Sequence, residues 1–201
     1  MIVGTTYGVA LNDREQLDAL APTFGESPYG AAPSAPVLYV KPRNCIAADG
    51  ARITLDDDVA DVAIGATIAL VASPCGFVTG RLAIDVFVPH VSFHRPAIAE
   101  QCRDGFLPLG LEAALPGNFE AIDVVTAING VERHRWCLAR LARGPEALHR
   151  EIGAFMTLLP GDLLLPGIAG DAPVARRGDR VHVSAAGVGD LSVELIAGDG
   201  A

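Results

Sequence analysis

One stretch constrains the fold more than any other. Residues 61–73 read DVAIGATIALVAS, an unbroken run of apolar and small residues after Asp61. The run is rich in Val, Ile and Thr, which favour extended backbone. An apolar run of this length without polar alternation predicts a strand that is buried on both faces. We therefore expect it to be central to the fold. After Asp61 it contains no carboxylate.

The remaining sequence reads as short strands joined by turns, with 22 Gly and 14 Pro scattered along 201 residues. We predict a short helix at 14–20, irregular structure at 89–110 and one amphipathic helix at 145–156 with Phe155 facing inward. Asn129-Gly130 predicts a hairpin turn. Further strands are expected at residues 2–9, 37–41, 53–55, 82–88, 122–128, 181–184 and 191–197. The predicted fold class is mixed β (α+β with few helices), in a single domain 1–201 whose residues 1–36 are a strand, the short helix and a loop.

The formal charge of −9 argues against non-specific binding of nucleic acid, which requires clustered cations. Lys41 is the only lysine, and Arg43, Arg95 and Arg103 are candidates to hold a small anionic ligand. The alternative is that these arginines form surface ion pairs. No run approaches the ~20 apolar residues of a membrane helix, and the N-terminus has no basic region before an apolar one. These features favour a cytoplasmic protein that does not associate with membranes.

The cysteine and histidine residues do not suggest a disulfide framework or a zinc site. The four cysteines form no CxxC pair and are expected to be reduced and buried. His90 and His94 have helical spacing, but prolines flank them and no Glu lies between them, which disfavours a metal pair. The GxSxG, GxxxxGK[ST] and HExxH patterns are also missing from the sequence.

Several motifs nevertheless resemble one family. VLYVKPRN, IGATIALV, FHRPAI, QCRDGFLPLG, FMTLLPGDLLLPG and RRGDRVHV occur in this order along the chain. Together they resemble the fumarylacetoacetate hydrolase superfamily, and FHRPAI with CRDGF resembles the N-terminal half of the bifunctional isomerase/decarboxylases of 4-hydroxyphenylacetate (homoprotocatechuate) degradation. The resemblance implies a β-sandwich roll and a small oxo-dicarboxylate or tricarboxylate as substrate. In active members, a Glu-x-Glu pair and an Asp hold Mg²⁺ or Mn²⁺, which neutralises enolate charge.

The sequence departs from the family pattern at most catalytic positions. Gly65 and Thr67 replace the two glutamates, so only Asp85 remains and no metal is expected in this chain. The family lysine corresponds to Gln101, the Gly-Thr-Pro loop to Gly167-Ile168-Ala169, and the lid His and Glu to Gln16 and Ala19. The resemblance leaves Lys41 and Asp85 as catalytic candidates. The substrate-binding candidates are the arginines chosen by charge, Arg43, Arg95 and Arg103, with Asn44 at the predicted end of a strand and Gly167 in the loop that the resemblance identifies.

Three hypotheses follow from this pattern. The first is an N-terminal-type subunit of a 2-hydroxyhepta-2,4-diene-1,7-dioate isomerase / 5-oxopent-3-ene-1,2,5-tricarboxylate decarboxylase, with Mg²⁺ or Mn²⁺ in a homologous partner. The second is a metal-free keto–enol tautomerase that uses Lys41 as its acid/base. The third is a catalytically silent structural subunit. The first and third predict a homo-oligomer or a complex with a metal-bearing homologous subunit.

Overall fold

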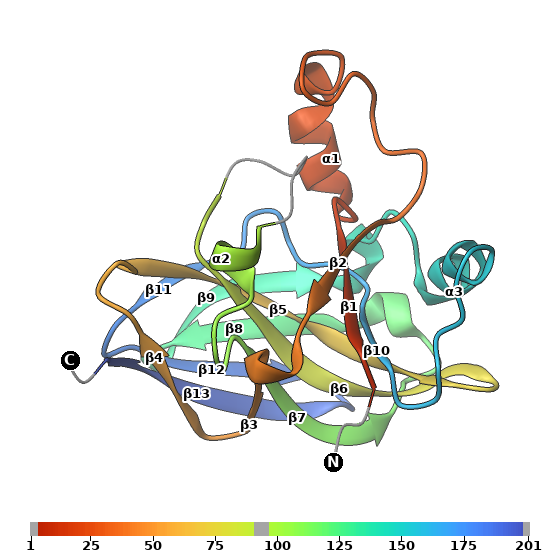
Figure 1. Cartoon of the computed structure of the whole chain (residues 1–201). Helices are drawn as coiled ribbons and strands as arrows, with labels where there is room; N and C mark the ends of the chain where they lie inside the picture. The colour runs from red at the N-terminus through yellow and green to blue at the C-terminus, as the bar shows by residue number, and fades with distance from the viewer. Residues whose placement is uncertain (1–3, 91–96, 199–201) are drawn as a thin grey trace.

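A computed structural model describes residues 4–90 and 97–198 as two β-sheets with short helices at their margins (Figure 1). The first sheet has the order β2-β1-β10-β5-β6-β7-β3, with β11 also paired to β5. The second has the order β4-β13-β12-β8-β9. The strands are β1 (Thr6–Ala10), β2 (Val37–Lys41), β3 (Ile46–Ala48), β4 (Ala51–Leu55), β5 (Asp61–Ser73), β6 (Gly76–Phe87), β7 (Leu107–Ala114), β8 (Asp123–Ile128), β9 (Val131–Cys137), β10 (Leu163–Leu165), β11 (Val174–Arg176), β12 (Arg180–Ala185) and β13 (Gly189–Ala197).

The helices are few and short, which confirms the predicted mixed-β class. They are α1 (Arg14–Leu20), α2 (Ile98–Gln101) and α3 (Pro145–Gly153), with 3₁₀ turns η1 (Ala21–Thr23), η2 (Arg43–Cys45), η3 (Phe119–Ala121) and η4 (Leu138–Arg140). Figure 1 shows α1 projecting above the strands and α3 lying to one side of them. Within the part of the chain that the structure describes, no helix is long and apolar enough to cross a membrane.

The stretch 61–73 forms β5, a strand of the first sheet. It pairs with β6 along its length and also with β10 and β11. Most of its residues are buried on both faces, as the apolar run predicted. One face, including Ile64 and Ile68, packs in the main core, which also contains Val183 and Leu191 from the second sheet. The main core therefore lies between the two sheets.

The first sheet curls so that its other face is also enclosed. Its outermost strands, β2 and β3, are separated in sequence only by Pro42 and η2, so the two edges of the sheet must lie close together. The curl surrounds a second, smaller core built from Cys45, Ala69, Ala83, Leu107, Leu109, Leu163 and Leu165. The side chain of Lys41, at the end of β2, is also buried.

Several local predictions are confirmed. The helix at Arg14–Leu20 has the predicted bounds. Asn129 and Gly130 have φ of 54° and 78°, as a tight hairpin turn requires, and they join β8 to β9. The sequence predicts the first strand at 2–9; β1 starts at Thr6, and residues 1–3 lie outside the described part of the chain.

Other local predictions are wrong. Segment 89–110 is not wholly irregular, because it contains α2 and the buried start of β7. Pairing with β6 and β3 on both sides outweighs the poor strand propensity of Pro108 and Gly110. The helix predicted to reach 156 ends at Gly153, and Phe155 is 65% exposed rather than buried. Of the four cysteines, Cys45 is buried but Cys75 is exposed.

Candidate active-site pocket

A buried ion pair lies at the centre of the candidate site. Lys41 ends β2 and Asp85 lies near the end of β6, so the curl of the sheet brings two strands together that are not neighbours within it. Lys41 Nζ lies 2.5 Å from Asp85 Oδ1, and both side chains have a relative exposure of 0%. The two catalytic candidates therefore lie in direct contact. An ion pair this deeply buried needs further hydrogen bonds to offset the loss of hydration.

Backbone carbonyls supply those hydrogen bonds to the ammonium. Lys41 Nζ donates to the carbonyl oxygens of Val86 at 2.9 Å, Gln101 at 2.6 Å and Phe106 at 3.2 Å. With the carboxylate of Asp85, these oxygens surround a group that has three N–H donors. Lys41 thereby ties β2 to β6, α2 and the segment before β7. Lys41 does not line the pocket described below.

Tyr39 connects this ion pair to the pocket. Its side chain lies on the same face of β2 as Lys41, two residues along the strand. The Tyr39 hydroxyl donates a hydrogen bond to Asp85 Oδ2, so each carboxylate oxygen has its own partner. The ring packs over Gly8 on β1, where an added Cβ would lie 2.1 Å from Tyr39 Cζ. Burial, and then the negative charge of Asp85, raises the pKa of Tyr39 well above its ordinary value, so the phenol stays protonated.

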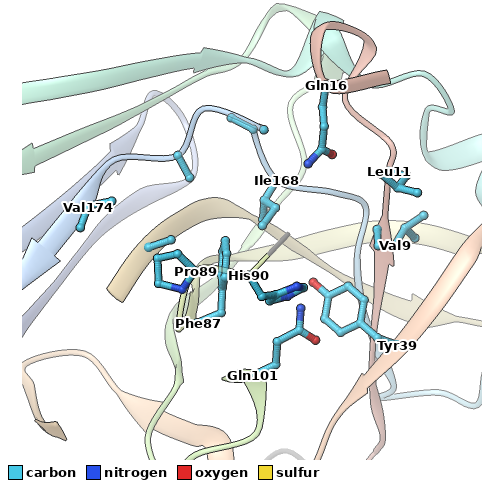
Figure 2. Close-up of a pocket in the computed structure, with 15 residues that line it drawn as sticks. Val9, Leu11, Gln16, Tyr39, Phe87, Pro89, His90, Gln101, Ile168 and Val174 are labelled. Atoms are coloured by element: carbon cyan, nitrogen blue, oxygen red, sulfur yellow. The ribbon is translucent and has the colours of Figure 1, made fainter. Parts of the chain in front are cut away.

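A pocket of about 200 Å³ is lined by Tyr39 but not by Lys41 or Asp85 (Figure 2). Its polar side chains are Gln16 from α1, Tyr39 from β2, His90 after β6 and Gln101 from α2. Figure 2 shows Tyr39, His90 and Gln101 pointing toward one another, with Gln16 and Ile168 on the opposite side. Apolar walls come from β1, the end of β6, the loop after β10, and β11. Segments distant in sequence thus meet around one small cavity.

Gly65 and Thr67, where the resemblance predicts the family's glutamates, offer no carboxylate to a divalent metal. A Cβ at Gly65 would lie 2.8 Å from the backbone oxygen of Asp85 and 2.9 Å from Cγ2 of Ile168. The Ile168 side chain therefore fills the space beside Gly65. Thr67 is fully buried and its hydroxyl has no hydrogen-bond partner among the described residues. Asp85 is already paired with Lys41 and Tyr39.

Among the residues that the structure describes, no alternative metal site replaces these positions. Within residues 4–90 and 97–198, no three His, Cys, Asp or Glu side chains come together as a metal-binding group. His90 lies in the pocket, and His94, with which the sequence disfavours a metal pair, lies outside the described residues.

The predicted anion-binding residues lie away from the pocket. Arg103 pairs with Asp56 at 2.8 Å and Asp58 at 2.7 Å, so its charge is used in a surface ion-pair cluster. Arg43 is exposed, and Asn44 donates hydrogen bonds to Cys102 O and Asp104 Oδ1. Arg95 lies outside the described residues. Among the described candidates for substrate binding, none lines the pocket.

Gly167 has a structural role that the structure shows directly. Its φ is 147°, and a Cβ there would lie 3.1 Å from Leu141 and 3.3 Å from Asn12. Asn12 in turn donates to the carbonyl oxygens of Pro166, at 2.6 Å, and Arg143, at 2.9 Å. These contacts hold the loop that carries Ile168 against the chain before α1. Gly167 thus positions the pocket wall without lining it.

Comparison with known proteins places this architecture in a family. The family described as fumarylacetoacetate (FAA) hydrolase C-terminal matches residues 5–196. The chain belongs to the fumarylacetoacetate hydrolase family. It is 38% identical, over 98% of its length, to the 4-hydroxyphenylacetate degradation bifunctional isomerase/decarboxylase of Salmonella dublin, and 39% identical over 96% to the Escherichia coli protein of that name. The chain spans about half the length of these relatives, 48% and 47% respectively.

Solved structures of fumarylacetoacetate hydrolase family proteins share the fold. The chain matches 2-hydroxyhepta-2,4-diene-1,7-dioate isomerase from Mycobacterium marinum with a TM-score of 0.76 and 20% identity, over 100% of this chain and 77% of that one. It matches fumarylpyruvate hydrolase from Pseudomonas aeruginosa in complex with Mn²⁺ and pyruvate with a TM-score of 0.76 and 16% identity, over 96% and 90%. The β-sandwich roll implied by the sequence resemblance is therefore confirmed.

Proposed function

We propose that this chain is an N-terminal-type subunit of a 2-hydroxyhepta-2,4-diene-1,7-dioate isomerase / 5-oxopent-3-ene-1,2,5-tricarboxylate decarboxylase in aromatic catabolism. The relatives with 37–39% identity are bifunctional isomerase/decarboxylases, and each is about twice as long as the matched region. In this proposal the chain acts in the cytoplasm beside a homologous subunit that holds Mg²⁺ or Mn²⁺. The substrate is a small oxo-dicarboxylate or tricarboxylate.

The observation that carries this division of labour is the filled space beside Gly65. A hard divalent cation requires several oxygen ligands. Here Ile168 occupies the place next to Gly65, and Asp85 is neutralised by an internal ammonium. No metal ion at this position would neutralise an enolate that develops on the substrate. Metal-dependent isomerisation and decarboxylation are therefore assigned to the partner.

The two alternatives make different predictions. In a metal-free tautomerase, Lys41 would exchange the proton, but its ammonium is fully buried and bonded to Asp85 and three carbonyl groups. This geometry favours a positioning role for Lys41 over direct contact with substrate. A structural subunit would support the partner without binding substrate. The presence of a pocket with four polar side chains favours a subunit that binds a ligand.

Reconstitution tests the proposal. The purified chain, a metal-bearing homologous subunit and their mixture would each be assayed with both substrates in the presence of Mg²⁺ or Mn²⁺. We expect no turnover by the chain alone and higher turnover by the mixture than by the partner alone, together with co-elution in size-exclusion chromatography. Equal turnover with and without the chain would refute the subunit assignment. Turnover by the chain alone that survives a chelator would instead support the tautomerase.

A further inference from the structure

Two cysteines that are distant in sequence meet in the fold. Cys45 is fully buried in the smaller core, and Cys102, directly after α2, packs against that core and is partly exposed. Both are free thiols, and a side-chain hydrogen bond links one thiol to the other. Their spacing in the sequence is not that of a CxxC pair, so only the fold brings the two sulfur atoms together.

Hydrogen bonds hold the two segments that carry these cysteines against each other. The Cys102 thiol donates to the carbonyl oxygen of Val40 at 3.5 Å, and Asn44 Nδ2 donates to the carbonyl oxygen of Cys102 at 3.0 Å. The amide of Gly105 donates to the carbonyl oxygen of Asn44, also at 3.0 Å. Cys45 follows Asn44 directly, so the backbone on either side of the thiol pair is already fixed. A disulfide requires two cysteines that are held close in this way.

The two thiols differ in access and in acidity. Burial raises the pKa of both, to about 11 for Cys45. For Cys102, the ammonium of Lys41 and the hydrogen bond from Cys45 lower the pKa, whereas Asp85 raises it. Cys102 is also the more exposed of the two thiols, so a reagent in solution reaches it first. Cys45 lies in position to react with a sulfur bond formed on Cys102.

We propose that Cys45 and Cys102 form a reversible disulfide when the chain meets a small-molecule disulfide such as oxidised glutathione. The Cys102 thiolate attacks one sulfur of the reagent, releases one thiol and becomes a mixed disulfide. The Cys45 thiolate then attacks the Cys102 sulfur and releases the second thiol. Two protein thiols are oxidised to one disulfide, one reagent disulfide is reduced to two thiols, and the two cysteine protons end on the released thiols. Excess reduced thiol reverses both steps.

The disulfide connects the redox state of the chain to the wall of the pocket. Gln101 lines the pocket, and its carbonyl oxygen accepts a hydrogen bond from Lys41 at 2.6 Å. α2 is only four residues long, and the amide of Cys102 closes it by a hydrogen bond to the carbonyl oxygen of Ile98. A covalent bond from Cys102 to Cys45 in the core restricts the opening of this turn and holds Gln101 in place. This modification site goes beyond the proposed subunit role.

Mass spectrometry of the full chain tests the proposal. The chain would be equilibrated with mixtures of reduced and oxidised glutathione, quenched with acid, denatured, alkylated and digested. At the oxidising end we expect one cross-linked peptide pair that contains Cys45 and Cys102, which dithiothreitol returns to two alkylated peptides. The control is Cys75→Ser/Cys137→Ser, which keeps only the proposed pair and should still form the disulfide. Two free thiols in fully oxidised glutathione, or a cross-link from either cysteine to Cys75 or Cys137, would overturn the proposal.

One variant and one further measurement test the order of the steps and the effect on α2. Cys45→Ala removes the second thiol, so the reaction should stop with one glutathione on Cys102; an unmodified Cys102 would contradict its role as the first thiol. In the wild-type chain, oxidation should slow amide hydrogen exchange at Gln101 and Cys102 by about tenfold, which keeps the test decisive if Cys45→Ala does not fold. Unchanged exchange in the oxidised chain would refute the link to the pocket wall. None of these outcomes depends on the isomerase or decarboxylase assay.

Discussion

Replacing Lys41 with Met tests whether the buried ion pair holds the curled sheet together. The substitution keeps an unbranched side chain of similar length but removes the ammonium. It leaves the Asp85 carboxylate buried without its cation, and it leaves three backbone carbonyls without the donor that they share. We expect a large loss of stability, because an uncompensated buried charge is among the most costly defects in a protein.

The size of the loss follows from the geometry. Two unit charges 2.5 Å apart attract by about 7 kcal/mol at an effective dielectric constant of ~20. The desolvation of both groups offsets part of this attraction, and removal of one partner from such pairs costs ~3–5 kcal/mol. With a urea m-value of about 2 kcal/mol/M, the midpoint of unfolding should fall by about 1.5–2.5 M. The measurement is urea denaturation followed by the fluorescence of Trp136, which is buried in the main core.

A double-mutant cycle separates the pair from its surroundings. The loss in Lys41→Met/Asp85→Asn should be smaller than the sum of the two single losses by about 1–3 kcal/mol, because the second change removes the charge that the first leaves unpaired. Arg43→Met is the matched control, since this exposed cation lies two residues along the chain and its loss should change stability by no more than about 0.5 kcal/mol. Additive single losses, or a similar midpoint for Lys41→Met and Arg43→Met, would refute the reasoning.

Three further predictions concern groups around this pair. Cys75 should react with a chromogenic disulfide reagent at pH 8 well before Cys45, because Cys75 is exposed. Burial raises the pKa of Cys45 to about 11, so at pH 8 only about one Cys45 thiol in a thousand is a thiolate. Equal reaction rates of the two cysteines would contradict this prediction. Burial and Asp85 raise the pKa of Tyr39, so above about pH 10 the unfolded chain loses a proton that the native chain keeps, and native stability falls. Between about pH 10 and 11, the free energy of unfolding measured in urea should fall more steeply for the wild type than for Tyr39→Phe, with slopes that differ by up to ~1.4 kcal/mol per pH unit. Equal slopes for the two proteins would argue against a raised pKa of Tyr39. Gly65→Ala should lower the free energy of unfolding in urea by about 1–3 kcal/mol, because the new Cβ meets Asp85 O and Ile168. Gly153→Ala is the control: its Cβ meets no atom within 4 Å, so the free energy of unfolding should change by no more than about 0.5 kcal/mol. Similar changes in the two variants would show that the space beside Gly65 is not filled.

Much of the fold could be predicted because local pattern and tertiary packing agree. The apolar run of β5 is buried on both faces, and the Asn129-Gly130 turn joins β8 to β9. Prediction failed where tertiary pairing overrides local preference. Leu107-Pro108-Leu109-Gly110 contains two residues that disfavour strands, yet it lies between β6 and β3 and is buried. No short-range signal in the sequence identifies those two neighbours.

The composition of the pocket was harder to predict than the ion pair. Resemblance directed attention to Lys41 and Asp85, which lie in contact, and their catalytic role remains a prediction. Arginine candidates were chosen by charge alone, and Arg103 is instead paired with two surface aspartates. The position of Tyr39 could be predicted from the sequence, because side chains alternate along β2 and Tyr39 therefore lies on the same face as Lys41. Gln16 lines the pocket from α1, at a position where the resemblance placed a family lid residue.

The relation between Gly65 and Ile168 explains why the sequence alone could not define this site. The resemblance predicts that Gly65 and Thr67 stand where the family carries glutamates, but it does not predict what fills the volume beside Gly65. Only the three-dimensional contact between Gly65 and Ile168, about 100 residues apart in sequence, shows that an aliphatic side chain occupies the space. Asp85 is held by Lys41 and Tyr39, so its negative charge is balanced within the protein. Placing glutamates at positions 65 and 67 would therefore require a smaller side chain at position 168, because a Cβ at Gly65 already meets Ile168, and it would also bury two carboxylates without a cation of their own.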